Sequence, residues 1–204
     1  MFQAASVVAA SSVEQESRGE IFKQMGHIAD VEEQVHAYGS VAQRTEISHI
    51  CEIGFNAGHS AILFLNSDKT NKLTSFDSGT LPWSPISSNF ISFLFPNRFS
   101  YITGNSVESV AEFASRVESD ELCDLFHIDG DHGMIVPFID LTNARQASRT
   151  GATIIMDDAT DSFPGVMIAW NKAKSEGWLK ENNCTGGVAT VGGYVKGWCI
   201  GELL

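Results

Sequence analysis

The hydrophobic positions of this chain follow two spacings that alternate along its length. Between residues 20 and 44 they recur every three or four positions, as on one face of a helix. Beyond residue 46, short apolar runs alternate with stretches of helical spacing, which predicts a mostly parallel sheet with helices on both faces. The expected strands are residues 47–53, 73–76, 99–103, 122–128, 153–156, 188–191 and 197–202, and the expected helices begin near residue 58 or cover 87–95, 107–117, 136–147 and 165–175.

This pattern predicts one doubly wound, Rossmann-like α/β domain with seven strands and a C-terminal antiparallel hairpin at one edge. The domain is expected to cover residues 20–204, after a flexible or helical lead-in over residues 1–19. No apolar run approaches the length of a membrane span, and the N-terminus lacks the basic region of a signal peptide. A cytoplasmic protein without a membrane partner is therefore expected.

The amino-acid composition further limits the kinds of partner that this chain is expected to bind. The 204 residues are 43% hydrophobic and 19% charged, as in an ordinary globular protein. The formal net charge is −12, from 25 acidic and 13 basic residues. Binding to nucleic acid needs clustered Lys and Arg, so a small molecule is the expected partner. The four cysteines show no CxxC spacing, and we expect reduced core thiols at Cys51, Cys123, Cys184 and Cys199.

A glycine-rich seam, "EIGFNAG", follows the first expected strand. Gly54 and Gly58 allow a sharp turn and a close approach, and Asn56 tolerates a left-handed backbone. Ser60 then places a hydroxyl at the start of the next helix, where a carboxylate is readily bound. Asp77 ends the next strand 23 residues after Gly54, an interval typical of an acid that binds ribose hydroxyls. The seam lacks GxGxxG and GxxxxGK[ST], which leaves a nucleoside site of another kind or glycines that serve packing alone.

Two further strands end in pairs of acids. Asp129 and Asp131 follow one strand, and Asp157 and Asp158 follow the next. Carboxylates brought together at one sheet edge repel one another unless a cation lies among them, and oxygen ligands of this kind suit Mg²⁺, Ca²⁺ or Mn²⁺ better than zinc. The alternative is that these residues serve as helix caps and turn formers.

Three histidines lie in or near these segments. His132 follows the first acidic pair, where it is either a general base or a residue without a chemical role. His127, inside an apolar strand, is expected to be a buried core residue. His59 is expected to shape the pocket at the glycine seam.

The chain resembles the class I S-adenosylmethionine (SAM)-dependent methyltransferases from about residue 20 to its C-terminus. The likeness is to the small metal-dependent O-methyltransferases of the catechol and caffeoyl-CoA type and of the macrolide-sugar type, in methyltransferase family 24. The segments that carry it, in order, are "EIGFNAGHSA", "SFD", "ITGNS", "DLFHIDGDH" and "IIMDD".

The resemblance implies a role for each matching position. It implies that the methionine and ribose end of the cofactor is lined by Glu52, Gly54, Asn56 and Gly58, and that Ser60 lies near the cofactor carboxylate. Asp77 is expected to bind the ribose hydroxyls, and Asn105 and Ser106 are expected beside the adenine. Asp129 is also expected to face the cofactor. A divalent metal, Mg²⁺ above all, would be held by Asp129, Asp157 and Asp158, and Asp129 and His132 would be catalytic. Catechol-type enzymes usually carry Glu where this chain has Asp77. Their lysine after the metal-site Asp has no counterpart, and His132 occupies that neighbourhood.

The implied reaction is methyl transfer from SAM to a hydroxyl of a small acceptor, assisted by the metal. The acceptor pocket is expected between the N-terminal helix, the stretch around Trp83 and the loop that contains Phe163. The sequence does not determine the oligomeric state, and a homodimer is one of the alternatives. Two other classes stay open: a nicotinamide-dependent oxidoreductase of Rossmann type, and a non-catalytic nucleoside-binding module on a methyltransferase scaffold.

Overall fold

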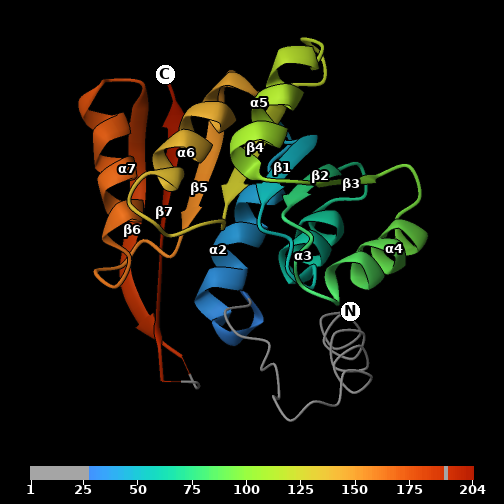
Figure 1. Ribbon diagram of the computed structural model, residues 1–204, viewed down its shortest axis with the longest axis horizontal. Helices are drawn as coiled ribbons and strands as arrows, with labels where there is room; N and C mark the ends of the chain where they lie inside the picture. The colour runs from blue at the N-terminus through green and yellow to red at the C-terminus, as the bar shows by residue number, and fades with distance from the viewer. Residues whose placement is uncertain (1–27, 191–192) are drawn as a thin grey trace.

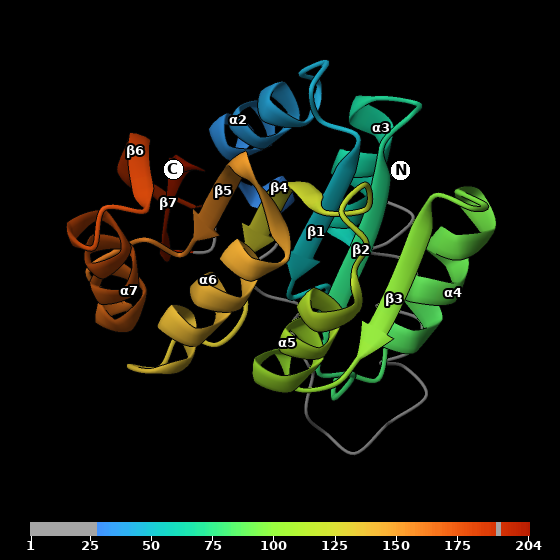
Figure 2. The ribbon, with the colours of Figure 1, turned by 90° about the horizontal axis from the view of Figure 1, so that it is seen from above.

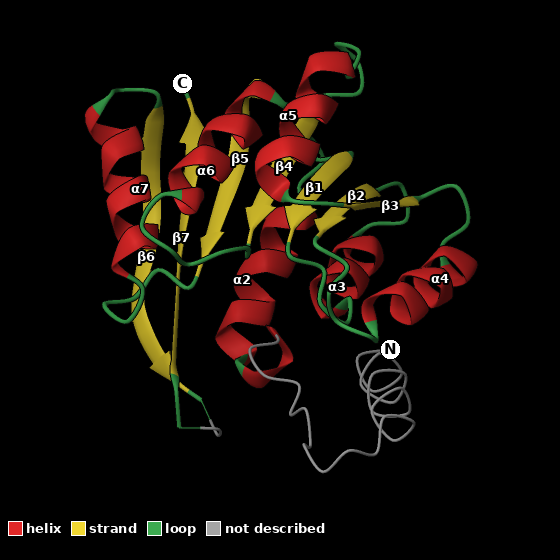
Figure 3. Cartoon of the chain, in the orientation of Figure 1, coloured by secondary structure: helices red, strands yellow, loops and turns green. Residues whose placement is uncertain are grey.

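The computed structural model describes residues 28–190 and 193–204. The expected lead-in over residues 1–19 and the first turns of the expected N-terminal helix lie outside the described residues. The described part of the chain begins with a short 3-10 helix, η1 (Ile28–Asp30), and then alternates between helices and strands (Figure 3). The helices are α2 (Glu32–Ala42), α3 (His59–Ser67), α4 (Ser84–Leu94), α5 (Ser106–Arg116), α6 (Val136–Gln146) and α7 (Pro164–Ser175); the strands are β1 (His49–Ile53), β2 (Lys72–Asp77), β3 (Phe99–Thr103), β4 (Cys123–Ile128), β5 (Ser148–Asp157), β6 (Leu179–Ala189) and β7 (Val195–Leu203).

The seven strands form one sheet in the order β3-β2-β1-β4-β5-β7-β6 (Figure 1). The pairs among β1 to β5 are parallel, whereas β7 is antiparallel to both β5 and β6. The predicted fold class is therefore confirmed, including the antiparallel C-terminal hairpin. The chain runs from β1 outward through β2 to β3 and then returns to β4, so the direction of winding reverses between β1 and β4. Ligands of doubly wound sheets bind at such a reversal, outside the carboxyl ends of the strands.

Helices cover both faces of the sheet, and each layer has its own apolar core. Seen from above, α2 and α3 lie on one side of the strands and α5, α6 and α7 on the other (Figure 2). The core under α2, α3 and α4 includes Tyr38, Phe55 and Phe64, and the opposite core includes Phe126 and Trp170. All six residues of β4 are buried, as expected of a central parallel strand covered on both sides.

The expected element boundaries agree with the structure to within a few residues, except in two strands and in the N-terminal helix, which within the described residues begins only at Glu32, after η1. β5 begins at Ser148 and β6 at Leu179, well before the expected starts at residues 153 and 188. The β6 extension is rich in exposed polar residues, and the β5 extension consists mostly of polar residues and glycine, so the hydrophobic pattern did not reveal either of them. None of the helices in the described part of the chain has the length and apolarity that crossing a membrane requires.

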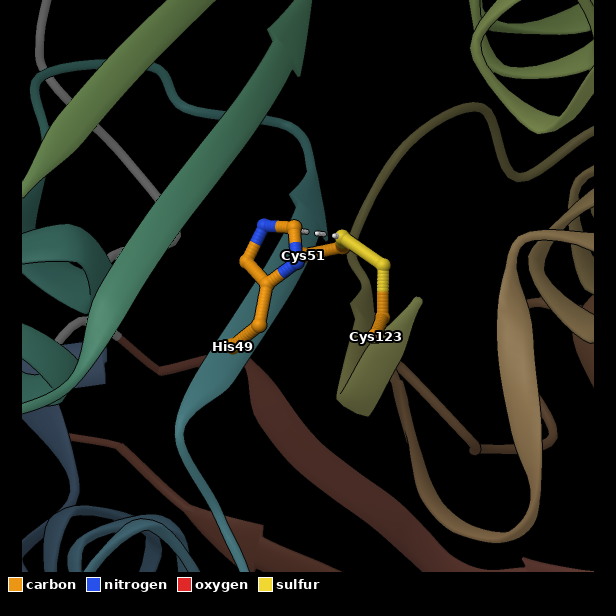
Figure 4. A group of neighbouring side chains, drawn as sticks. All are labelled: His49, Cys51 and Cys123. Carbon is orange, nitrogen blue, oxygen red and sulfur yellow. Dashed lines mark hydrogen bonds between the residues drawn. A yellow bond between two sulfur atoms is a disulfide. The ribbon is translucent and has the colours of Figure 1, made fainter. Parts of the chain in front are cut away.

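The expectation of reduced core thiols is wrong in this structure. Cys51 of β1 is joined to Cys123 of β4, and Cys184 of β6 to Cys199 of β7. Each disulfide links two neighbouring strands of the sheet, a pairing that depends on the strand order. Figure 4 shows the first of them with His49 beside it, the ring Nε2 lying 3.9 Å from Cys51 Sγ. The expectation of a cytoplasmic protein rested partly on reduced cysteines and loses that support.

Candidate active site

A cavity of about 620 Å³ opens at the carboxyl ends of β1, β2, β4 and β5, where the direction of winding reverses. Most residues that the sequence nominated for a site line this cavity, although they come from five separate segments of the chain. These are Gly54, Asn56, Ser60, Asp77, Asn105, Ser106, Asp129, His132, Asp157 and Asp158. His59 and Asp131 line it as well. The convergence follows from the fold, because parallel strands bring their carboxyl ends to one edge of the sheet.

The glycine seam turns tightly against the rest of the protein. Gly54, Asn56 and Gly58 all have positive φ angles, of 90°, 49° and 83°. A Cβ atom on Gly54 would lie 1.8 Å from the carbonyl oxygen of Asp129, so no side chain fits there. A Cβ on Gly58 would lie 2.4 Å from Cδ1 of Ile91. Gly58 itself is not part of the cavity wall; its absent side chain lets α4 pack against the start of α3.

Asp77 binds the loops that form the cavity wall. One carboxylate oxygen accepts hydrogen bonds from the backbone N–H groups of Phe55 and Asn56, at 3.0 and 3.1 Å. The other oxygen accepts from the Gly79 N–H at 2.7 Å and from the Tyr101 hydroxyl at 3.2 Å. Asp77 thus holds the glycine seam in place, and a ligand hydroxyl would share its oxygens with these donors.

Glu52 does not line the cavity, contrary to the role that the resemblance implied. Its side chain is fully buried beneath the cavity wall. Its two oxygens accept hydrogen bonds from the hydroxyls of Ser60, at 2.7 Å, and Ser75, at 2.5 Å. The strand pleat explains this position, because Glu52 points into the layer between β1 and α3. Glu52 supports the wall through Ser60 instead of facing a ligand.

Asn105 and Ser106 form the start of α5 beside the cavity. The Asn105 side chain caps the helix by accepting a hydrogen bond from the Val107 N–H at 3.0 Å. The capping leaves the amide nitrogen of Asn105 and the Ser106 hydroxyl as polar groups on this part of the wall.

The acids after β4 and β5 meet at the opposite side of the cavity. Asp157 is buried, and Oδ1 accepts hydrogen bonds from the Gln34 side chain, at 2.7 Å, and from the Asp158 N–H, at 2.8 Å. Asp158 has a left-handed backbone, with φ of 54°, which is unusual for a residue other than glycine. Its Oδ2 lies 2.9 Å from His132 Nε2, and its Oδ1 lies 3.0 Å from Lys196 Nζ. Asp158 therefore joins a histidine at the cavity wall to a buried lysine.

The pKa values of this acid cluster are strongly perturbed. Burial raises the pKa of Asp129 to about 7, and the nearby Asp157 and Asp158 carboxylates add to the increase against the effect of Lys196. Burial by itself would raise the pKa of Asp157 too, but Lys196 and His127 hold it well below its usual range. The hydrogen bond to Asp158 raises the pKa of His132. Neighbouring groups whose pKa values are shifted strongly in opposite directions tend to cluster at functional sites.

The two other histidines occupy different environments from His132. His127 is buried, as expected, and lies 3.7 Å from Glu52 and 3.9 Å from Asp157. Burial opposes its charged form, but Asp157 and Glu52 raise its pKa to about 9. His132 is partly exposed, with its ring 4.4 Å from that of Phe163 between centroids. Phe163 thus contacts His132, whereas Trp83 is buried and donates a hydrogen bond to Asn56.

Two of the described residues at the acid cluster were not anticipated. Gln34 of α2 is fully buried, and its amide bonds both Asp157 and the Tyr38 hydroxyl. Lys196 lies in the apolar run "YVKGWCI" and is 2% exposed. A lysine within such a run is unusual, since lysine is almost never buried without a partner. That signal was present in the sequence, but the identity of its partners depends on how β7 pairs with β5.

Comparison with known proteins places the site in context. A family model described as a methyltransferase domain matches residues 51–159, which include the glycine seam and both acidic pairs. Comparison with curated proteins finds no match. Among solved structures, an O-methyltransferase from Bacillus cereus in complex with SAH is similar at 14% identity, with 100% of this chain and 90% of that chain covered and a TM-score of 0.73. The O-methyltransferase TomG from Streptomyces achromogenes, involved in tomaymycin synthesis and in complex with SAM, is also 14% identical, with 98% and 89% covered and a TM-score of 0.73. At these identities the structural likeness shows the fold.

Proposed function

This chain belongs to the methyltransferase-domain family, whose model matches more than half of it, and on that premise we propose that it transfers a methyl group from SAM to a hydroxyl of a small acceptor. The observation that carries the proposal is the cavity at the winding reversal, with the glycine seam and Asp77 on one side and the acid cluster on the other. Its volume of about 620 Å³ lies within the usual range for small-molecule and cofactor sites.

The cavity wall offers groups for each part of SAM. Asp77 is positioned to accept hydrogen bonds from the ribose hydroxyls, next to the turn at Gly54. Asn105 and Ser106 offer polar groups to the adenine. Ser60 and Asp129 also line the cavity. When bound, SAM supplies the methyl group as an electrophile on a sulfonium centre.

His132 is our candidate for the general base. Nε2 of the ring is paired with Asp158 Oδ2 at 2.9 Å, so Nδ1 is left to accept the proton of the acceptor hydroxyl. The acceptor oxygen forms a bond to the methyl carbon while the carbon–sulfur bond breaks, and the hydroxyl proton passes to His132. Asp158 orients the ring and stabilises its charged form, as a carboxylate does for other catalytic histidines.

The acceptor is proposed to be a small molecule because of the charges at the site. Asp129, Asp131, Asp157 and Asp158 all line the cavity, and such a surface repels the phosphates of a nucleic acid. The cytoplasmic location and a homodimer stay predictions, as does the single domain over residues 20–204. Family membership favours methyl transfer over the nicotinamide-dependent alternative.

The Mg²⁺ ion that the resemblance implied is not included in this mechanism. One ligand atom each from Asp129, His132 and Asp158 lie within 4.8 Å of one another, so donor type and spacing alone suit a cation. The surroundings do not suit it, because Lys196 already places an ammonium group against Asp157 and Asp158. Mg²⁺ bound by Asp129, Asp157 and Asp158 stays a prediction, and this arrangement of residues speaks against it.

Calorimetric titration with S-adenosylhomocysteine (SAH) tests the proposal. We expect micromolar affinity for the wild type and a loss of about tenfold or more for Asp77→Asn, which removes one charged acceptor. Asp68→Asn is the matched control, because Asp68 is an exposed acid near the start of β2. Absence of SAH binding by the folded wild type would overturn the proposal. Binding would justify a screen of hydroxylated acceptors with methyl-labelled SAM.

A further inference from the structure

Lys196 is a buried lysine that takes no part in the proposed methyl transfer. The register of the sheet explains how it reaches the acid cluster. Asp157 of β5 is paired with Trp198 of β7, so Lys196, two residues before Trp198 in the chain, lies on the same face of the sheet. Gly197 holds this end of β7 close to the loop after Asp158: its carbonyl accepts a hydrogen bond from the Ala159 N–H at 2.8 Å. A Cβ on Gly197 would lie 2.6 Å from the Ala159 carbonyl oxygen.

The ammonium group of Lys196 lies between the two acids that end β5. Nζ is 3.2 Å from Asp157 Oδ2 and 3.0 Å from Asp158 Oδ1. The remaining oxygens of these carboxylates are also engaged. Asp157 Oδ1 accepts from Gln34 and from the Asp158 N–H, and Asp158 Oδ2 is bonded to His132. All four oxygens of two of the three expected metal ligands therefore have protein partners.

This arrangement does not leave room for a divalent cation. A Mg²⁺ ion binds carboxylate oxygens at about 2.1 Å, so it would displace the hydrogen bonds just described. It would also lie next to a lysine whose side chain is 2% exposed. Two cations close together in a buried site repel strongly, because little water is present to screen them.

We propose that Lys196 takes the place of a divalent cation in this site: its ammonium group neutralises Asp157 and Asp158 and holds Asp158 against His132, so that methyl transfer needs no metal. The catalytic part of this inference rests on the proposed function. Lys196 acts as a positioning residue, since it reaches the acceptor only through Asp158 and His132. The Lys196 ammonium group supplies the positive charge that a bound metal would otherwise supply.

Metal titration of the full-length protein tests this inference directly. We expect the thermal midpoint of the wild type to change by about 1 °C or less in about 5 mM MgCl₂ or MnCl₂, because the carboxylates are already occupied. Lys196→Met removes the charge and keeps most of the side-chain volume. This variant should have a lower midpoint, and either metal should raise it by about 5 °C or more, because the freed carboxylates now bind the ion. Calorimetry with MnCl₂ should show binding to the variant alone.

Lys180→Met is the matched control, because Lys180 lies on β6 of the same hairpin and is exposed. It should behave as the wild type in every titration. Wild-type protein that binds Mg²⁺ tightly, or that loses turnover in EDTA and regains it with Mg²⁺, would overturn the inference. So would a folded Lys196→Met that gains no affinity for metal. If Lys196→Met does not fold, the wild-type titration decides.

The same samples are titrated with SAH. Failure of the wild type to bind SAH would count against the proposed function and would leave the metal titration interpretable. The two proposals can therefore fail separately.

Discussion

The acids at the two ends of β4 have opposite environments: one is surrounded by hydrogen-bond donors, and the other lies among carboxylates. Asp124, near the amino end, accepts hydrogen bonds from the Ser48 N–H and hydroxyl and from the His49 N–H, and it also pairs with Arg149 at 2.6 Å. Asp129, directly after the carboxyl end, faces the cavity among other carboxylates. Burial would raise the pKa of Asp124, but the backbone and hydroxyl donors and Arg149 lower it; Asp129 has its pKa raised to about 7.

This difference separates an acid that stabilises the fold from one that is available to a ligand. The donors around Asp124 satisfy both of its oxygens, so the folded protein has nothing to gain from a further partner there. Asp129 lies where the fold supplies mainly negative charge. A site that binds or transforms a ligand is expected where polar groups are held together without full mutual satisfaction.

The largest effect is expected at Asp129. Asp129→Asn should lower turnover by about a thousandfold with whichever acceptor supports the wild type, because the acid lies within 4.0 Å of the proposed base and faces the reaction space. The thermal midpoint should not fall, since the variant removes a charge that burial disfavours. Turnover is measured with methyl-labelled SAM, and circular dichroism verifies the fold. Full activity in Asp129→Asn would show that the comparison misidentifies the functional end of β4.

The disulfide beside Asp124 should matter for stability and not for the site. Replacing Cys51 and Cys123 together by Ala should lower the free energy of unfolding by about 4 kcal/mol, because the bond closes a separation of 72 residues. The matched control replaces Cys184 and Cys199, whose separation of 15 residues predicts a loss of about 3 kcal/mol. Denaturant unfolding measures both variants. Four free thiols in the denatured, unreduced wild type would contradict the premise.

Asp124 itself is expected to contribute less than the disulfide. Asp124→Ala leaves the Ser48 and His49 N–H groups without their acceptor and should cost about 2 to 3 kcal/mol at pH 7. The lowered pKa makes this contribution present above the unfolded-state value of about 3.9 and lost as the pH falls through the folded-state value. Wild type and variant should therefore become equally stable in acid. Denaturant unfolding across pH tests this, with the exposed Asp120→Ala as control; a constant difference down to low pH would refute the electrostatic account.

Most of the fold and most of the cavity wall were predictable because both follow from local patterns. Apolar runs such as 122–128 mark buried strands, and in a parallel sheet the residues after each strand meet at one edge. Asp77 and Asp157 could therefore be assigned to the same region without coordinates. Their roles toward SAM, acceptor and metal stay predictions.

The features that were missed depend on pairings between distant strands. Lys196 reaches Asp158 only because β7 inserts between β5 and β6 in antiparallel register. The cysteine pairs depend on the same strand order. Glu52 was placed at the cavity because it lies in the glycine motif, but the pleat of β1 directs its side chain beneath the wall. Spacing along the chain carries no information on these points.

A third acid, Asp140, extends the comparison. It lacks the set of hydrogen-bond donors that surrounds Asp124, and it does not line the cavity that Asp129 faces. Asp140 of α6 is fully buried, and its oxygens accept no hydrogen bond of good geometry within the described residues, although the nearby Ser106 hydroxyl lowers its pKa against the effect of burial. Burial raises its pKa to about 6, so the folded protein binds this proton more tightly than the unfolded chain does. Stability should therefore fall as the pH rises from about 4 to about 6, with the full penalty present above that range. Asp140→Asn should raise the free energy of unfolding by about 2 kcal/mol at pH 8 and by little at pH 4. Denaturant unfolding at the two pH values measures this, and a variant less stable than the wild type at pH 8 would mean that the Asp140 charge is satisfied in solution.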